Sequence, residues 1–129
     1  KLMFFEYYKN AGLKTDKINL KDASGVSRYN TLSTSWMSEA LVFLDKNSTI
    51  KNYMITSGEG TLSRRMRDLT GNLKAKTGTI FGVSSLTGYL KSLNGADYAF
   101  SIIIQNFGER ASVVKGLEDD IVNGIYFLE

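Results

Sequence analysis

The chain has 129 residues, 43% of them hydrophobic and 22% charged, and it contains no histidine, cysteine or proline. The lack of histidine and cysteine excludes a Ser-His-Asp triad, thiol nucleophiles, disulfides and the usual tetrahedral zinc sites. Any hydrolytic chemistry must therefore use Ser, Thr, Lys, Tyr, Asp or Glu. The net charge is +3 and the basic residues are scattered, so the charge pattern does not predict nucleic-acid binding.

The length allows a single domain with one core. No stretch reaches the roughly 18 apolar residues that a membrane span needs, and the first residues lack the pattern of a signal peptide. The chain opens with Lys1-Leu2-Met3 and has no initiator methionine. We therefore interpret it as a piece of a longer protein.

The first half of the chain predicts two helices separated by a loop. Residues 1–10 carry apolar side chains at helical spacing and are followed by Gly12, a residue type common after helices. Residues 22–30 are rich in turn formers and predict a loop. An apolar stripe over residues 36–44 predicts the second helix, with capping side chains available at residues 33–35.

The second half predicts an antiparallel sheet. A short helix is expected after the Gly58-Glu59-Gly60 break, and strands are expected over residues 73–79, 83–93 and 98–106. The Asn94-Gly95 pair is a strong hairpin signal because these residue types readily adopt positive φ. The last strand is almost continuously apolar, which predicts a central strand buried on both faces.

A final helix is expected from about residue 109 to residue 128, because its apolar residues repeat at spacings of three and four. These residues are Val114, Leu117, Ile121, Ile125 and Leu128. The predicted fold class is α+β, with a three-strand antiparallel meander packed with helices.

The candidate chemistry lies at the end of the first predicted strand, in Lys76-Thr77-Gly78-Thr79. The Lys76 ammonium can attract a substrate carboxylate and assist proton transfer, and the Thr77 hydroxyl can hydrogen-bond that carboxylate. Gly78 leaves room for an extended substrate, and the Thr79 backbone N–H can stabilise an oxyanion. The alternative is an ordinary strand that ends in a polar turn, and the tripeptide alone does not decide between the two.

The residues around this motif follow an order seen in one enzyme family. The segments are Gly58-Glu59-Gly60-Thr61-Leu62, Arg65, Lys74 to Thr79, Gly82-Val83-Ser84 and Leu86-Thr87-Gly88-Tyr89. Upstream, Asp22 to Asn30 resembles the Asp-Gly-Ser-Gly-Leu-Ser-Arg-x-Asn signature. From about residue 10 to residue 107 the chain resembles class C penicillin-binding proteins, the D-alanyl-D-alanine carboxypeptidases/endopeptidases of the DacB or penicillin-binding-protein-4 type.

The resemblance implies that residues 1–129 are the C-terminal segment of a transpeptidase-like catalytic domain with the β-lactamase fold. It implies an extracytoplasmic serine enzyme that acts on D-Ala-D-Ala stem peptides of peptidoglycan through an acyl-enzyme, binds β-lactams and needs no metal or cofactor. Lys76 and Thr79 would be catalytic, and Thr77, Gly78 and Thr79 would bind substrate. The family's Ser-x-x-Lys and Ser-x-Asn motifs precede the Asp22 signature, so we expect them before Lys1 and expect this chain alone to be inactive.

Literal matches to the two missing motifs occur at Ser48-Thr49-Ile50-Lys51, Ser112-Val113-Val114-Lys115 and Ser92-Leu93-Asn94. About one chance Ser-x-x-Lys match is expected in such a composition, and the matches come in the wrong chain order for the family. We therefore interpret Ser112 as a residue of a helix start and Ser92 as part of the hairpin turn.

Other readings remain open at this stage. The chain could be a stand-alone binding or structural module of the same fold, or, less in keeping with its signature, a β-lactamase fragment. The group Arg64, Arg65 and Arg67 could bind anionic wall polymer, although a solvated helix face is the simpler interpretation. Arg28 is expected to brace its loop. An exposed sheet edge predicts a possible homodimer.

Overall fold

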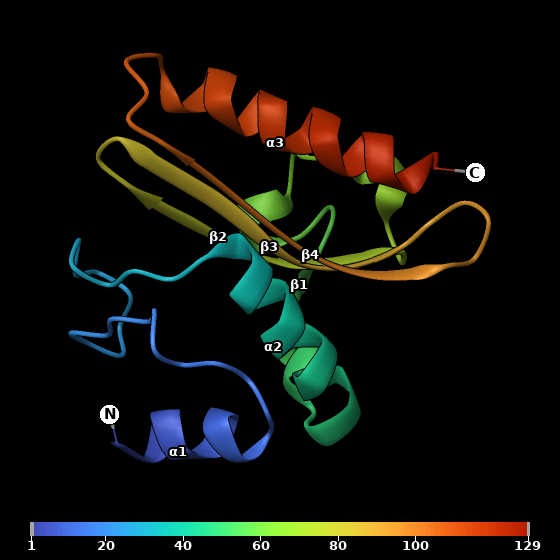
Figure 1. The fold of residues 1–129 in the computed structure, drawn as a ribbon. Helices are drawn as coiled ribbons and strands as arrows, with labels where there is room; N and C mark the ends of the chain where they lie inside the picture. Colours follow the sequence, from blue (N-terminus) through green and yellow to red (C-terminus); the bar gives the residue numbers. More distant parts are fainter. Residues whose placement is uncertain (1, 129) are drawn as a thin grey trace.

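The computed structural model describes residues 2–128. It contains a four-stranded antiparallel sheet with helices on both sides (Figure 1). The strands lie in the order β1-β2-β3-β4. In chain order the elements are α1 (Leu2–Asn10), α2 (Thr34–Asn47), η1 (Ile50–Tyr53), β1 (Ile55–Thr56), η2 (Gly60–Leu62), η3 (Arg67–Leu69), β2 (Leu73–Ile80), β3 (Val83–Lys91), β4 (Asp97–Gln105) and α3 (Ala111–Tyr126).

The sheet lies between α3 on one face and α2 on the other (Figure 1). The main core is on the α3 side, where eight buried side chains form one cluster: Leu62, Leu69, Leu73, Ala75, Leu86, Leu90, Phe100 and Val122. On the opposite side α2 buries Trp36, Ala40 and Leu41. The Tyr89 hydroxyl on β3 donates a hydrogen bond to the Leu41 carbonyl at 2.8 Å, which ties α2 to the sheet. No helix within residues 2–128 has the length and apolar character needed to cross a membrane.

The α+β class and the three-strand meander are confirmed, with one addition and one correction. The addition is β1, a two-residue strand that pairs with β2 through Ile55 and Thr56. The correction concerns β4, which is an edge strand within the described residues, whereas β3 has partners on both sides. The apolar run of β4 has another cause: α2 packs on one face of it, and the α3-side core contacts Phe100 and Ile102 on the other. The predicted pairing of exposed sheet edges between two copies stays a prediction.

Two helical predictions differ in their outcome. Helix α2 begins as predicted, because the Ser33 side chain accepts a hydrogen bond from the Trp36 N–H at 3.1 Å. The short helix expected after residue 60 is instead two 3₁₀ turns, η2 and η3. They are separated by Met66, whose φ of 49° breaks a continuous helix. Each turn still buries one leucine, Leu62 and Leu69.

Helix α3 is shorter than predicted and faces the sheet differently. The predicted stripe is wrong at Leu117, Ile121 and Leu128, which are 52%, 39% and 51% exposed, and Leu128 lies beyond the end of α3. The buried residues of α3 are Val114, Glu118 and Val122, which repeat every four positions. A glutamate therefore occupies a core position, because other side chains supply partners for its carboxylate.

Candidate active site

The motif strand β2 has an open edge beside Lys76–Ile80. On its other side β2 pairs with β3 along its whole length, from Leu73 with Leu90 to Ile80 with Val83. On the outer side β1 pairs only with Lys74 and Ala75. The remainder of β2 therefore has no partner strand on that side within the described residues, so an extended ligand could pair there.

The backbone groups of Thr77 and Thr79 point toward this open edge. Asn72 directs its carbonyl toward β3, where it accepts a hydrogen bond from the Lys91 N–H at 2.9 Å. Leu73 directs its carbonyl the other way, where it accepts from the Thr56 hydroxyl at 3.0 Å. Because the direction alternates along an antiparallel strand, residues 75, 77 and 79 also present N–H and C=O to the outer edge. The Thr79 N–H therefore faces the open edge, and its role as an oxyanion donor stays a prediction.

The polar side chains of the motif lie on opposite faces of β2. Lys76 donates from Nζ to the Thr77 carbonyl at 2.6 Å, so its ammonium lies beside the open edge. The Thr77 hydroxyl donates to the Thr61 hydroxyl at 2.9 Å. Sequence reasoning missed Thr61 as a site residue, although its segment was part of the family pattern. The pair of hydroxyls adds a second polar group next to the motif.

Gly78 lies against its neighbour Ser85 on β3. A Cβ at this position would lie 2.5 Å from the Ser85 Oγ, a distance that side chains do not adopt. The Ser85 hydroxyl in turn donates to the Gly78 carbonyl at 3.4 Å. The motif glycine therefore has a packing reason within the sheet, in addition to the predicted room for a substrate.

The signature loop, residues 22–30, is organised around Asp22. Its carboxylate accepts hydrogen bonds from the Ser24 hydroxyl and the Gly25 N–H at one oxygen and from the Ser27 N–H at the other, over 2.8–3.0 Å. Desolvation opposes ionisation, but these bonds and one from Asn30 together lower the pKa of Asp22. The segment is a loop, as predicted, and the structure adds that it is built around a charged carboxylate.

Arg28 connects the signature loop to the turn that follows the motif strand. Its guanidinium donates to the Phe81 carbonyl at 2.5 Å and lies 5.8 Å from the centre of the Phe81 ring. Phe81 is in the turn between β2 and β3, directly after the motif strand. The bracing role expected for Arg28 is confirmed, and the braced element is the turn beside Thr79.

Arg65 is the exception to the interpretation of the arginine group as a solvated face, because Arg64 and Arg67 are exposed. Its side chain is only 12% exposed and contacts Glu118 at 2.8 Å and Asp119 at 2.7 Å. Desolvation opposes the charge of Arg65, but hydrogen bonds to Asp119 and Glu118 raise its pKa above the usual value. Arg65 is therefore a permanent cation that joins the segment after η2 to α3.

The literal copies of the missing motifs have structural partners. The Ser48 hydroxyl donates to the Leu44 carbonyl at 2.8 Å at the end of α2. Its lysine, Lys51, forms an ion pair with Asp45 at 3.1 Å. The Ser92 hydroxyl forms hydrogen bonds with the Asn94 side-chain oxygen and the Ala96 carbonyl within the hairpin turn. Ser112 is the second residue of α3. None of these contacts joins a serine to its motif lysine.

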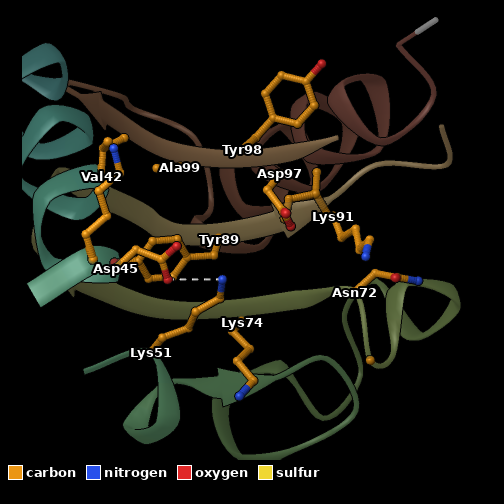
Figure 2. Close-up of a pocket in the computed structure, with 13 residues that line it drawn as sticks. Val42, Asp45, Lys51, Asn72, Lys74, Tyr89, Lys91, Asp97, Tyr98 and Ala99 are labelled. Carbon is orange, nitrogen blue, oxygen red and sulfur yellow. Dashed lines mark ion pairs between the residues drawn. The ribbon is translucent and has the colours of Figure 1, made fainter. Parts of the chain in front are cut away.

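A cavity of about 300 Å³ lies on the α2 side of the sheet, apart from the motif. Lys46, Lys51, Lys74 and Lys91 are among its lining residues. Figure 2 shows that the three labelled lysines diverge: Lys51 turns to Asp45, Lys74 points away from Tyr89, and Lys91 turns toward Asn72. The charges therefore do not converge on one ligand. Across residues 2–128 no cluster of three or more Asp and Glu side chains is arranged to hold a metal ion.

Comparison with known proteins identifies the family of this chain. The sequence profile described as the D-Ala-D-Ala carboxypeptidase 3 (S13) family matches residues 5–123. This chain belongs to that family. It is 28% identical over 131 residues to D-alanyl-D-alanine carboxypeptidase DacB of Haemophilus influenzae, covering 89% of this chain and 27% of the relative. It is 32% identical over 127 residues to the D-alanyl-D-alanine carboxypeptidase of Actinomadura sp., covering 90% and 23%.

Solved structures place the fold in the same group. Penicillin binding protein 4 from Haemophilus influenzae matches with a TM-score of 0.86 and 27% identity, over 97% of this chain and 31% of that chain. The TLA-1 extended-spectrum β-lactamase matches with a TM-score of 0.71 at 18% identity, over 94% and 51%, and shows the fold alone. The chain thus spans about a quarter of the curated relatives it matches. The resemblance to DacB-type proteins and to the β-lactamase fold is confirmed.

Proposed function

We propose that this chain is the C-terminal catalytic segment of an extracytoplasmic serine D-Ala-D-Ala carboxypeptidase or endopeptidase that cleaves peptidoglycan stem peptides. The observation that carries the proposal is the open edge of β2, where Thr77 and Thr79 present their backbone groups next to the Lys76 ammonium. The family match over residues 5–123 supports the reaction class. A solved relative, penicillin binding protein 4, is described in complex with a β-lactam.

The charged group and the backbone groups of the motif bind different parts of the substrate. The terminal carboxylate lies in the potential of Lys76 and accepts hydrogen bonds from the hydroxyls around Thr77 and Thr79. The extended stem peptide pairs with the edge of β2. The Thr79 N–H donates to the carbonyl oxygen as negative charge develops on it, which is worth on the order of 10²–10³ in rate for one such donor.

The reaction itself needs a nucleophile that this chain does not supply. A serine outside residues 1–129 attacks the carbonyl carbon of the penultimate D-Ala, the C–N bond breaks, and the terminal D-Ala leaves with a proton on its amine. Water then hydrolyses the acyl-serine. The partners of Ser48 and Ser92 support this assignment, because their hydroxyls are bonded within the helix end and the hairpin.

Covalent labelling tests the proposal. We expect the 129-residue chain to gain no mass with a labelled penicillin, and we expect Lys76→Ala to reduce acylation strongly in a protein that also carries the upstream segment. A stoichiometric adduct on Ser48 or Ser112 would contradict the missing nucleophile. Undiminished acylation of the Lys76→Ala protein would show that Lys76 does not contribute to acylation.

A further inference from the structure

A glutamate buried beneath the sheet is not used by the proposed chemistry. Glu118 on α3 has no exposed surface, and both carboxylate oxygens are bonded. One accepts from the Ser84 hydroxyl at 2.7 Å, and the other from the Arg65 guanidinium at 2.8 Å. A carboxylate in a core costs several kcal/mol to desolvate unless it is well paired, and apolar residues often serve stability as well or better. Stability alone therefore does not account for this pair, and its position in the fold indicates what else it does.

Through Ser84, Glu118 reaches the residue opposite Thr79. Ser84 is fully buried on β3, and its partner in the register is Thr79. Thr79 directs its backbone groups to the open edge, so the two residues form a non-hydrogen-bonded pair, in which side chains of facing strands lie closest. The Ser84–Glu118 bond thus holds the strand position against which Thr79 packs.

Through Arg65, the same carboxylate reaches the other side of the motif. Arg65 follows η2, which contains Thr61, and the Arg65 N–H donates to the Leu62 carbonyl at 3.0 Å. Thr61 in turn accepts the hydrogen bond from Thr77. Asp119 also contacts Arg65, but its side chain is on the surface side and no hydrogen bond joins it to Ser84. Glu118 is therefore the group that links both neighbours of the motif.

We propose that Glu118 is a positioning residue: from α3 it fixes, through Ser84 and Arg65, the Thr79 amide and the Thr77 hydroxyl that bind the D-Ala-D-Ala end of the substrate. This inference rests on the proposed function for its ligand. Helix α3 then does more than cover the sheet, because it sets the geometry of an edge that it does not line.

Native-state hydrogen exchange separates positioning from general stability. The variant is Ser84→Ala, which removes one bond to Glu118 and leaves the Arg65 pair intact. The matched control is Ser92→Ala, another buried, hydrogen-bonded serine, which lies at the far end of β3. We expect exchange of the Gly78 and Ile80 amides, which face β3, to accelerate about tenfold in Ser84→Ala, as for a lost bond to a charged group. Ser92→Ala should leave these amides unchanged.

A titration with a peptide ending in D-Ala-D-Ala, followed by NMR, tests the functional half. The Ser84→Ala chain should bind at least several-fold more weakly than the Ser92→Ala chain. Unchanged Gly78 and Ile80 exchange, or equal acceleration throughout the sheet, would overturn the positioning role. If the unmodified chain shows no binding, the proposed function fails, and the exchange result still decides whether Glu118 holds the end of β2.

Discussion

Replacing Gly78 by alanine tests whether the motif glycine is required by the sheet itself. The added Cβ would lie 2.5 Å from the Ser85 Oγ, so the Ser85 side chain must rotate and lose its 3.4 Å bond to the Gly78 carbonyl. Rotating that hydroxyl away loses one neutral hydrogen bond, which costs about 0.5–1.5 kcal/mol. Because alanine is favoured over glycine within a strand by about 0.5–1 kcal/mol, we expect Gly78→Ala to lower the free energy of unfolding by about 1 kcal/mol or less, measured by urea denaturation.

The double variant makes the reasoning specific. With Ser85→Ala the offending oxygen is gone, and the next contact, to the Ser85 Cβ, is an ordinary 3.9 Å. Alanine is also favoured over glycine within a strand by about 0.5–1 kcal/mol. The Gly78→Ala/Ser85→Ala chain should therefore be at least as stable as Ser85→Ala alone, with a coupling energy of about 0.5–1.5 kcal/mol. Additive effects of the two substitutions would refute this explanation of Gly78.

Three further predictions concern the helix cap and two titrating groups. Ser33→Ala should cost about 1 kcal/mol, because it removes the cap of α2; urea denaturation showing no loss would contradict the assignment. Burial, then the Asp45 carboxylate and Tyr8, raise the pKa of Tyr89 to about 12. The folded chain holds this proton more tightly, so stability should fall from about pH 10 to about 12. Tyr89→Phe should reduce that fall and leave the part that comes from Tyr8, whose pKa is also raised by burial. The pKa of Asp22 is lowered, so its stabilisation of the loop should be present above the ordinary aspartate pKa and be lost at more acidic pH. The amide chemical shifts of the loop should follow this titration, and Asp22→Asn should remove their acid dependence.

The sequence was sufficient for elements defined by local patterns. Strands β2, β3 and β4 begin and end within two residues of their predicted limits, because the alternation of side chains and the Asn94-Gly95 turn act over short distances. The cap of α2 was predictable for the same reason. The sequence could not show that β4 is an edge strand within residues 2–128, because an apolar run indicates cover on the two faces of a strand and says nothing about its two edges.

The site shows the same division. The placement of Lys76, Thr77, Gly78 and Thr79 together on one strand was predictable, because one short motif contains them; their roles in binding and catalysis stay predictions. Their supports come from far along the chain: Arg28 reaches Phe81 and Thr61 reaches Thr77. Glu118 was the hardest to foresee, since a helical pattern assigns a glutamate to solvent unless the distant Arg65 is known to face it. The occurrence of Arg65 in the family pattern was the available signal.

Binding of the substrate carboxylate at β2 tests the central claim most directly. The 129-residue chain, labelled with ¹⁵N, is titrated with an N-acylated peptide ending in D-Ala-D-Ala and, as a control, with the same peptide amidated at its C-terminus. We predict saturable shifts of the Thr77, Gly78 and Thr79 amides with the acid, little response to the amide, and loss of the response in Lys76→Ala. Equal responses to both peptides, or shifts confined to the cavity around Lys51, would contradict the account.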